Sequence, residues 1–293
     1  MSTVATDIKS VADQTDQFLQ NYFSKQKQHN DLYEAMAYGL FAGGKKIRSY
    51  LTVAAFDLFN LQQKDALVIA AAIECVHSYS LIHDDLPSMD DDDLRRGKAS
   101  THKKFGESTA ILAGNSLLTI AFEILTSDSF TLDKSIKSDL VLALSSCSGH
   151  LGIAGGQFLD LSFEGTSQSP QAVIDMQNKK TGELMGFCVE AAAIVAGQTK
   201  ERALLKKIGL DIGLLFQISD DMLDEYGDQG KLGKPSKQDH KKGKATLLST
   251  LGLKKTNVLA KDLLNQIKNS LKKYGSKADR LISSAEYILQ RDH

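Results

Sequence analysis

Two clusters of aspartates are the residues of this 293-residue chain best suited to chemistry. The first lies between Asp84 and Asp93 and is followed by Arg95 and Arg96, and the second lies at 220–224. Carboxylates packed this densely repel one another unless a cation lies between them, and Mg²⁺ binds one or two carboxylates together with substrate phosphates. Basic residues beside the acids suit phosphate oxygens. The pattern predicts a site that holds a diphosphate through metal ions.

The second cluster has helical spacing. Residues three, four and seven positions apart share a helix face, so Gln217, Asp221 and Asp224 form one stripe, with Asp220 at its margin. The apolar residues between them indicate a helix that faces the core, which disfavours a merely solvated acidic face. We expect these four oxygen-bearing side chains to point the same way.

The first cluster is less regular, since Asp84 and Asp90 would lie on different faces of a continuous helix. Pro87 predicts that the helix ends near Leu86 and that the chain turns to bring Asp90 back beside Asp84. The acids at 91–93 are interpreted as a solvated loop, with metal binding as the alternative. The spacing of an EF-hand calcium loop, with its central glycine and terminal glutamate, is absent.

Basic residues form the complementary half of the site. A glycine pair at 43–44 precedes Lys45 and Arg48 and would let these cations approach an anion closely. Lys180 lies in a similar short segment, and both segments are also typical of ordinary surface turns. A glycine-rich basic loop at 227–244 follows the second acid cluster, and we expect it to be mobile.

One histidine shares a helix stripe with the first acid cluster. His77, Ser80 and Asp84 are spaced so that they lie on the same face of a helix. The position fits a site residue and fits equally a core histidine whose ring is satisfied by a backbone carbonyl.

Composition favours a single all-α domain over residues 1–293. The 35 basic and 36 acidic side chains nearly cancel, which gives no reason to expect nucleic acid or an anionic membrane as a partner. Only three prolines occur, and apolar residues recur at helical spacing, for example over 204–216 and 259–271. The helices expected at 67–82 and 187–196 are apolar on more than one face, which is typical of a bundle centre or a subunit interface.

The sequence predicts no membrane span and a cytoplasmic location. The longest apolar runs, 66–73 and 191–197, fall short of the ~18 residues of a spanning helix. The polar N-terminus resembles neither a secretory signal nor a transit peptide. Three cysteines without a CxxC pair predict reduced, buried thiols.

Five motifs in this order resemble those of the trans-isoprenyl diphosphate synthases, over nearly the whole chain. They are Gly43–Arg48, Asp84–Gly97, Gly155–Gln157, Lys180–Glu183 and Gln217–Asp224. The two extra residues within the first aspartate motif resemble the bacterial short-chain farnesyl diphosphate synthases (geranyltranstransferases) of that family. Lys46, Ser49 and Asn115 depart from the usual arginine, proline and aspartate, but none of them is assigned to metal or diphosphate.

The resemblance implies a large all-α bundle around a central cavity, usually a homodimer. It implies Mg²⁺-dependent head-to-tail condensation of isopentenyl diphosphate with dimethylallyl or geranyl diphosphate, mainly to farnesyl diphosphate, and Mn²⁺ can replace Mg²⁺. A geranylgeranyl diphosphate synthase, a terpene cyclase and a non-catalytic regulatory subunit are the alternatives. A cyclase is disfavoured because its second motif usually mixes Asn, Ser and Glu, and a subunit because both aspartate motifs are whole here.

The resemblance also assigns roles to individual residues. The metal ligands would be Asp84, Asp90, Asp220 and Asp224. The allylic diphosphate would contact Arg95, Lys180, Thr181, Gln217, Lys234 and Lys244. Isopentenyl diphosphate would contact Lys45, Arg48, His77 and Arg96. The residues expected to drive catalysis are Asp84, Asp90, Arg95, Lys180, Asp220 and Lys234.

Product length would depend on how deep the apolar pocket runs below Asp84. In the family, the fifth residue before the first aspartate commonly forms the pocket floor. Here that residue is Tyr79, ~7.5 Å along the helix, with Ser80 beside it. The bulky ring resembles synthases that stop at fifteen carbons, and ordinary core packing is the alternative interpretation of Tyr79.

Overall fold

The computed structural model describes residues 3–25, 30–226 and 244–290. The helices in chain order are α1 (Thr3–Lys25), α2 (Asp31–Leu40), α3 (Ile47–Asp57), α4 (Gln63–Asp84), α5 (Thr101–Phe105), α6 (Glu107–Thr126), α7 (Lys134–Ser148), α8 (Ile153–Phe163), α9 (Pro170–Gln177), α10 (Glu183–Val195), α11 (Thr199–Tyr226), α14 (Leu247–Leu251), α15 (Leu253–Leu271) and α16 (Asp279–Gln290). A π-helical turn, η1 (Asn178–Gly182), joins α9 to α10, and a 3₁₀ segment, η2 (Lys272–Ala278), joins α15 to α16. The strands in these ranges are two residues each, β1 (Leu94–Arg95) and β2 (Lys98–Ala99), so the predicted all-α fold is confirmed.

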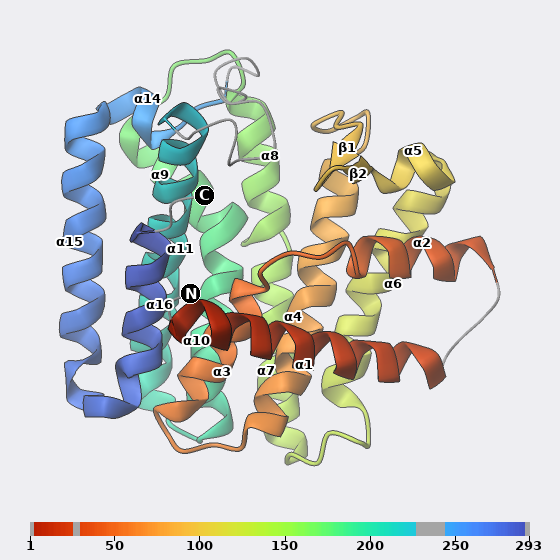
Figure 1. Ribbon diagram of the computed structural model, residues 1–293, viewed down its shortest axis with the longest axis horizontal. Helices are drawn as coiled ribbons and strands as arrows, with labels where there is room; N and C mark the ends of the chain where they lie inside the picture. Colours follow the sequence, from red (N-terminus) through yellow and green to blue (C-terminus); the bar gives the residue numbers. More distant parts are fainter. Residues whose placement is uncertain (1–2, 26–29, 227–243, 291–293) are drawn as a thin grey trace.

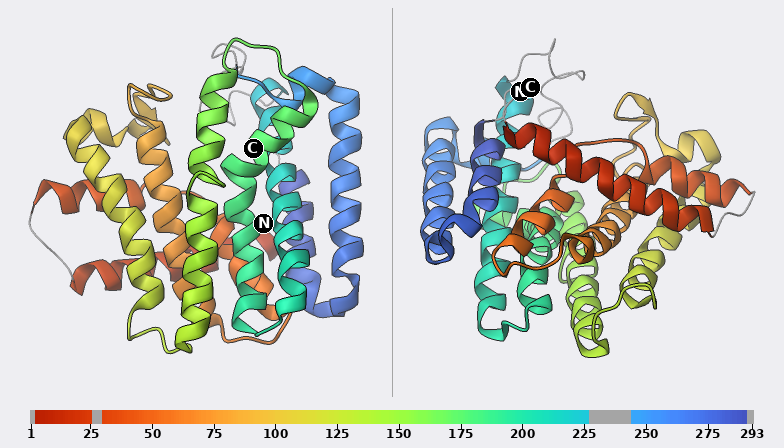
Figure 2. Two further views of the ribbon diagram at one scale, coloured as in Figure 1. Left: turned by 180° about the vertical axis from the view of Figure 1, so that it is seen from behind. Right: turned by 60° about the horizontal axis from the view of Figure 1, so that its bottom comes forward.

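The long helices run side by side as a bundle, and α1 lies across them (Figure 1). α4 packs against α3 and α6, while α10 packs against α3, α7 and α11. α15 and α16 lie beside α11 at one edge, and the view from behind shows the same arrangement (Figure 2). The end of α4 and the end of α11, which carry the two aspartate clusters, lie at the same end of the bundle (Figure 1).

The two helices that are apolar on several faces form the centre of the bundle, as predicted. Every side chain of α10 from Leu184 to Ile194 is buried, and so is every side chain of α4 from Ile69 to Val76. Stretches of α4 and α6 are long and apolar enough to cross a membrane, but 72% of the α4 stretch and 39% of the α6 stretch are buried inside this fold. We interpret both as core helices, because such helices have the same composition.

The three cysteines lie in this core. Cys75, Cys147 and Cys188 are free and buried, as the sequence predicts. Burial raises the pKa of each thiol above its ordinary value, because the interior disfavours the thiolate. Nucleophilic chemistry by these residues is therefore disfavoured.

Two glycines let neighbouring helices approach η1 closely. A Cβ at Gly213 of α11 would lie 2.8 Å from the Cα of Gly182, and a Cβ at Gly156 of α8 would lie 2.1 Å from the backbone nitrogen of Lys180. Close packing leaves no room for such an atom, so a larger residue at either position would push the backbone of η1 away. η1 is thereby held between α8 and α11. π-helical turns of this kind are frequent at functional sites.

Candidate active site

The first aspartate cluster folds back on itself at the end of α4. The helix ends at Asp84, two residues before the predicted end at Leu86, and the chain then turns. The backbone N–H of Asp90 donates a hydrogen bond to the carbonyl oxygen of Asp84 at 2.8 Å. The prediction that the turn returns Asp90 to Asp84 is therefore confirmed.

The surroundings of Asp84 disfavour the ionised form of its carboxyl group. Burial, together with the neighbouring charge of Asp90, raises its pKa from 3.8 to about 6, although Lys180, Arg95 and Lys244 act in the opposite direction. Two buried carboxylates side by side lose this penalty when a hard cation lies between them. The oxygen donors of Asp84 and Asp90 therefore fit a divalent metal ion such as Mg²⁺.

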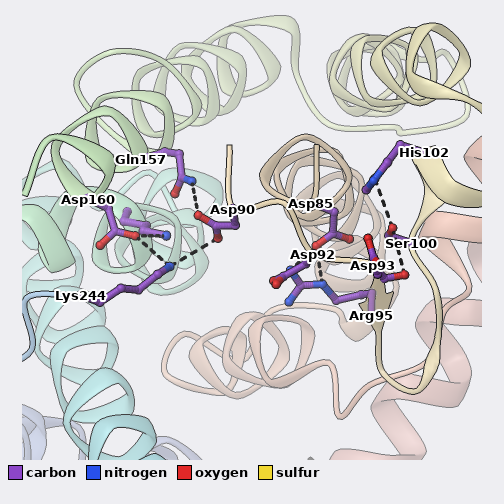
Figure 3. A network of polar contacts seen from close by, with 11 residues as sticks. Asp85, Asp90, Asp92, Asp93, Arg95, Ser100, His102, Gln157, Asp160 and Lys244 are labelled. Atoms are coloured by element: carbon purple, nitrogen blue, oxygen red, sulfur yellow. Dashed lines mark hydrogen bonds and ion pairs between the residues drawn. The ribbon is translucent and has the colours of Figure 1, made fainter. Parts of the chain in front are cut away.

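A buried network of charges joins Asp90 to two lysines (Figure 3). Lys180 Nζ lies 2.6 Å from Asp160 Oδ2, and Lys244 Nζ lies 3.4 Å from both Asp160 Oδ2 and Asp90 Oδ2. Gln157 Nε2 donates to Asp90 Oδ1 at 3.4 Å. The structure thus brings together two lysines from distant segments that were predicted to contact the allylic diphosphate.

Asp160 is a member of this network that the sequence analysis missed. It is 5% exposed. Burial would raise its pKa, but the ammonium groups of Lys180 and Lys244 outweigh burial and hold the pKa below its ordinary value. Asp160 follows Gln157 by three positions in α8, so helical spacing from the Gly155–Gln157 motif could have found it.

Two residues of the second cluster contact the segment formed by α9 and η1. Thr181 Oγ1 donates to Gln217 Oε1 at 3.1 Å, which links α11 to η1. Asp221 is 6% exposed and accepts hydrogen bonds from the backbone nitrogen of Leu247 at 3.2 Å and from Gln177 Nε2 at 3.5 Å. Gln217 and Asp221 thus both reach the α9–η1 segment, and Asp221 also accepts a hydrogen bond at the start of α14. The expectation that all four oxygen-bearing side chains point the same way stays a prediction.

Asp220, one turn after Gln217, lies near a second group of cations. Burial lowers the pKa of Arg48, and the negative charges of Glu74 and Asp220 partly oppose that effect. Asp224 lies one turn further along α11 and is half-buried. Asp220 and Asp224 remain predicted metal ligands.

The second group of cations lies between α3, α4 and the β1–β2 hairpin. Arg48 Nη1 lies 3.4 Å from His77 Nε2, and Arg48 Nε is buried without a hydrogen-bond partner within the described residues. Burial lowers the pKa of His77 well below its ordinary value, and the neighbouring Arg48 and Arg96 add to this, so the ring is neutral. His77 and Arg96 line a cavity between these elements. A buried guanidinium nitrogen without a partner is suited to an incoming anion.

Lys45 precedes α3 at the edge of this region. Its side chain is exposed, and Nζ lies 6.0 Å from the centre of the Tyr287 ring. Lys234, together with most of the basic loop at 227–244, lies outside the described residues. The predicted contacts of Lys45 and Lys234 with diphosphate remain predictions.

Arg95 is engaged by carboxylates in this structure. Its Nε donates to Asp85 Oδ1 at 2.9 Å, its Nη2 also contacts Asp85, and Asp92 Oδ2 lies 3.5 Å from Nη2 (Figure 3). Asp85 is 2% exposed. This pairing gives Asp85 a structural role that fixes the hairpin to the end of α4, and it holds Arg95 at the cavity wall beside Arg96.

The acids at 91–93 do not behave alike. Asp91 and Asp93 are exposed, as the solvated-loop interpretation expects, whereas Asp92 is half-buried and pairs with Arg95. Oxygen atoms of Asp91 and Asp93 lie within 4.8 Å of a ring nitrogen of His102, so these residues could also hold a metal ion. Because Lys103 Nζ already lies 2.8 Å from Asp93 Oδ1, this trio is a weaker candidate than Asp84 and Asp90.

Both the hydroxyl and the ring of Tyr79 have contacts that hold the side chain in place. It is 8% exposed, its hydroxyl donates to the carbonyl oxygen of Ser148 at 3.1 Å, and its ring meets the ring of His83 edge to face at 5.7 Å. Ser80 Oγ bonds instead to the carbonyl oxygen of His77 within α4. A clamped aromatic ring five residues before Asp84 is consistent with a rigid pocket floor.

Comparisons with known proteins agree with this geometry. The polyprenyl synthetase family model matches residues 29–284. The chain belongs to this family. It is 42% identical to the farnesyl diphosphate synthase of Escherichia coli over 271 residues, which is 90% of this chain and 91% of that protein. The predicted family and the predicted prenyltransferase class are thereby confirmed.

Solved structures of family members have the same fold. An FPP/GFPP synthase from Zymomonas mobilis superposes with a TM-score of 0.85 at 41% identity, over 97% of this chain and 99% of that chain. A geranyltransferase from Helicobacter pylori, solved with magnesium and isoprenyl diphosphate, superposes with a TM-score of 0.81 at 30% identity, over 99% and 97% of the two chains.

The raised pKa of Asp84 predicts that Asp84→Asn stabilises the protein when divalent metals are absent. In the unfolded chain Asp84 ionises near 3.8, and in the folded chain near 6. As pH rises from about 4 to 6, the unfolded state loses this proton first, so the wild type loses stability that the variant keeps. The difference should level off above pH 6 at no more than about 3 kcal/mol. Urea unfolding with a chelator measures it, and equal stabilities at pH 8 would contradict the raised pKa.

Proposed function

We propose that this protein condenses isopentenyl diphosphate head-to-tail with dimethylallyl and then geranyl diphosphate, and that its main product is farnesyl diphosphate. The observation that carries the proposal is the presence of two separate cation groups at one end of the bundle. Lys244 lies beside Asp90 and shares Asp160 with Lys180, while Arg48 and Arg96 lie near His77. Two diphosphates of different chemistry require two such sites.

The allylic diphosphate would bind at the first group. Bound Mg²⁺, held by Asp84, Asp90, Asp220 and Asp224, would supply positive charge that stabilises the leaving diphosphate, and Mn²⁺ would serve in its place. Lys180 and Lys244 would add positive charge on the side of α8 and η1. In the structure Asp160 and Asp90 hold these ammonium groups ready, and the incoming phosphate oxygens would take over part of their bonding.

Isopentenyl diphosphate would bind at the second group, where Arg48 offers its unpartnered Nε. The allylic C–O bond would ionise to a carbocation and diphosphate, the double bond of isopentenyl diphosphate would attack that cation, and a proton would then leave to the departed diphosphate. The apolar residues around Tyr79 would exclude water from the carbocation. No nucleophilic side chain is needed, which agrees with the inert, buried cysteines.

The condensation assay separates this proposal from its rivals. Purified protein with Mg²⁺, dimethylallyl diphosphate and isopentenyl diphosphate should give linear products, mainly of fifteen carbons, and a chelator should abolish them. A cyclised hydrocarbon would identify a terpene cyclase, and turnover only after a second protein is added would identify a regulatory subunit. Mainly twenty-carbon products would identify a geranylgeranyl diphosphate synthase.

Replacing the pocket floor should lengthen the product. Tyr79→Ala or Tyr79→Ser removes the ring that lies five residues below Asp84, so a growing chain could extend past this point. Chromatography of the product chains should show a shift from fifteen to twenty or more carbons. An unchanged product distribution in an active, folded variant would refute the floor assignment.

We also propose that two copies of this cytoplasmic protein associate through the face formed by α6 and α7. Large apolar side chains are exposed there, including Leu112 at 54% and Leu142 at 63%. Exposed apolar surface of this kind marks interaction sites, and closed two-fold dimers are the commonest oligomers.

Sedimentation should report twice the mass of one chain, and Leu112→Asp combined with Leu142→Asp should shift the protein toward the monomer, because charges on both sides of a buried interface repel. Val258→Asp on α15 is the matched control, since Val258 is 53% exposed on a different edge of the bundle. A dimer that survives the double substitution would exclude this face.

A further inference from the structure

Glu74 is a buried carboxylate for which the proposed chemistry has no role. It lies in the middle of α4 and is 4% exposed, between apolar neighbours on both sides in the sequence. Removing a carboxylate from water is costly unless hydrogen bonds and opposite charges compensate. The partners of Glu74 therefore indicate what the residue does.

Its direct partners come from the turn and helix that carry Arg48. Ser49 Oγ donates to Glu74 Oε1 at 2.7 Å, and Lys46 Nζ lies 3.7 Å from Glu74 Oε2. Lys46 is itself buried, and Asp16 Oδ1 lies 3.1 Å from its Nζ. Lys46 has a left-handed backbone (φ 46°) at the N-cap of α3, so the anchored ammonium helps to hold a turn that a non-glycine residue seldom adopts.

The charge of Glu74 also acts on the two guanidinium groups of the second cation group. Burial lowers the pKa of Arg48 and of Arg96, and the carboxylate of Glu74 opposes this effect at both residues. Glu74, Lys46, His77 and Arg96 line the same cavity. Glu74 is therefore a carboxylate on α4 that lies near Lys46 and whose charge also reaches Arg48 and Arg96.

Without this carboxylate, Arg48 and Arg96 would lose a negative charge that offsets their own, and Lys46 would keep only its pairing with Asp16. The mutual repulsion of these cations would spread the long side chains apart, and a spread set could not meet both phosphates of a diphosphate at once. The hydrogen bond from Ser49 fixes the carboxylate so that its charge stays at one point. The bond depends on a hydroxyl at position 49, where the family usually has proline.

We propose that Glu74, oriented by Ser49 and Lys46, is a positioning residue for isopentenyl diphosphate, an inference that rests on the function proposed above. It does not contact the reacting atoms. It keeps the cations of the second group in the geometry that receives the diphosphate of the second substrate. The allylic diphosphate, which binds among Asp84, Asp90 and Lys180, does not depend on it.

Steady-state kinetics of Glu74→Gln test the proposal. The amide keeps the size of the side chain and can still accept the hydrogen bond from Ser49, but it lacks the charge. The KM for isopentenyl diphosphate should rise about tenfold, while the KM for geranyl diphosphate stays within about twofold of wild type. Ser49→Ala should raise the same KM by a smaller factor, because the carboxylate remains but is no longer fixed.

Glu190→Gln is the matched control. Glu190 is also buried on a central helix, at 8% exposed, and pairs with Arg202 at 3.1 Å, outside the cavity. This variant should leave both KM values unchanged, so a general effect of removing a buried charge is separated from an effect at the second site. Thermal unfolding of each variant checks that it folds.

Three outcomes would overturn the assignment of Glu74. An unchanged KM for isopentenyl diphosphate would show that the cations hold their positions alone. A lower KM would show that the carboxylate only competes with the substrate, and an equal rise for both substrates would show a general structural role. If the wild type forms no condensed product, the proposed function itself fails, and the inference fails with it.

Discussion

The chemistry of this bundle depends on balancing charges that burial makes costly. Asp84 and Asp90 are held together by the backbone turn after α4, so neither carboxylate can move away from the other. Lys180 of η1 and Lys244, which precedes α14, supply part of the positive charge that offsets these carboxylates. The pKa of Asp84 is still raised, so the two lysines offset the burial of its carboxylate only in part. A site left in this condition favours the binding of further positive charge, which a metal ion supplies.

Close backbone packing makes that balance possible. Lysine side chains are long and flexible, and their ammonium groups hold a fixed place only if the backbone that carries them is fixed. Gly156 and Gly213 allow α8 and α11 to meet η1 at backbone contact, which brings Asp160 and Gln217 to the residues of η1. The polar network is therefore a consequence of small residues at helix crossings.

The two cation groups are built differently, and the difference suits different partners. Around Asp90, lysines lie between carboxylates. The carboxylates can therefore bind a metal ion, and the lysines can bind phosphate oxygens. Around Glu74 one carboxylate lies near Lys46, and its charge also acts on two arginines. Arginine presents a planar fork of donors that matches phosphate oxygens, so this second group needs no metal ion to bind a diphosphate.

Several features could be read from the chain because they depend on local rules. Helical periodicity and the scarcity of proline predicted the all-α fold, and the all-round apolar helices predicted which segments lie at the centre. Pro87 predicted the turn that returns Asp90 to Asp84, since the restriction that proline places on the backbone is local. The short hairpin was not predicted, because its strands are only two residues long and its turn at Arg96 and Gly97 lacks the usual Asn-Gly or Asp-Gly pair.

Other features depended on segments that are distant in the sequence. Spacing alone placed Asp221 on the same stripe as Gln217, but only the fold showed that Asp221 also accepts a hydrogen bond from the backbone of Leu247. Glu74 became recognisable only when the fold brought Lys46 to it, and the lysine partners of Asp160 likewise came from the fold, although spacing could have pointed to Asp160 itself. The sequence by itself determined which segments are helical and which hold acids and bases, because those are properties of neighbours along the chain. Only the tertiary structure decided which charges meet, because a buried charge takes its partners from whichever helices pack around it.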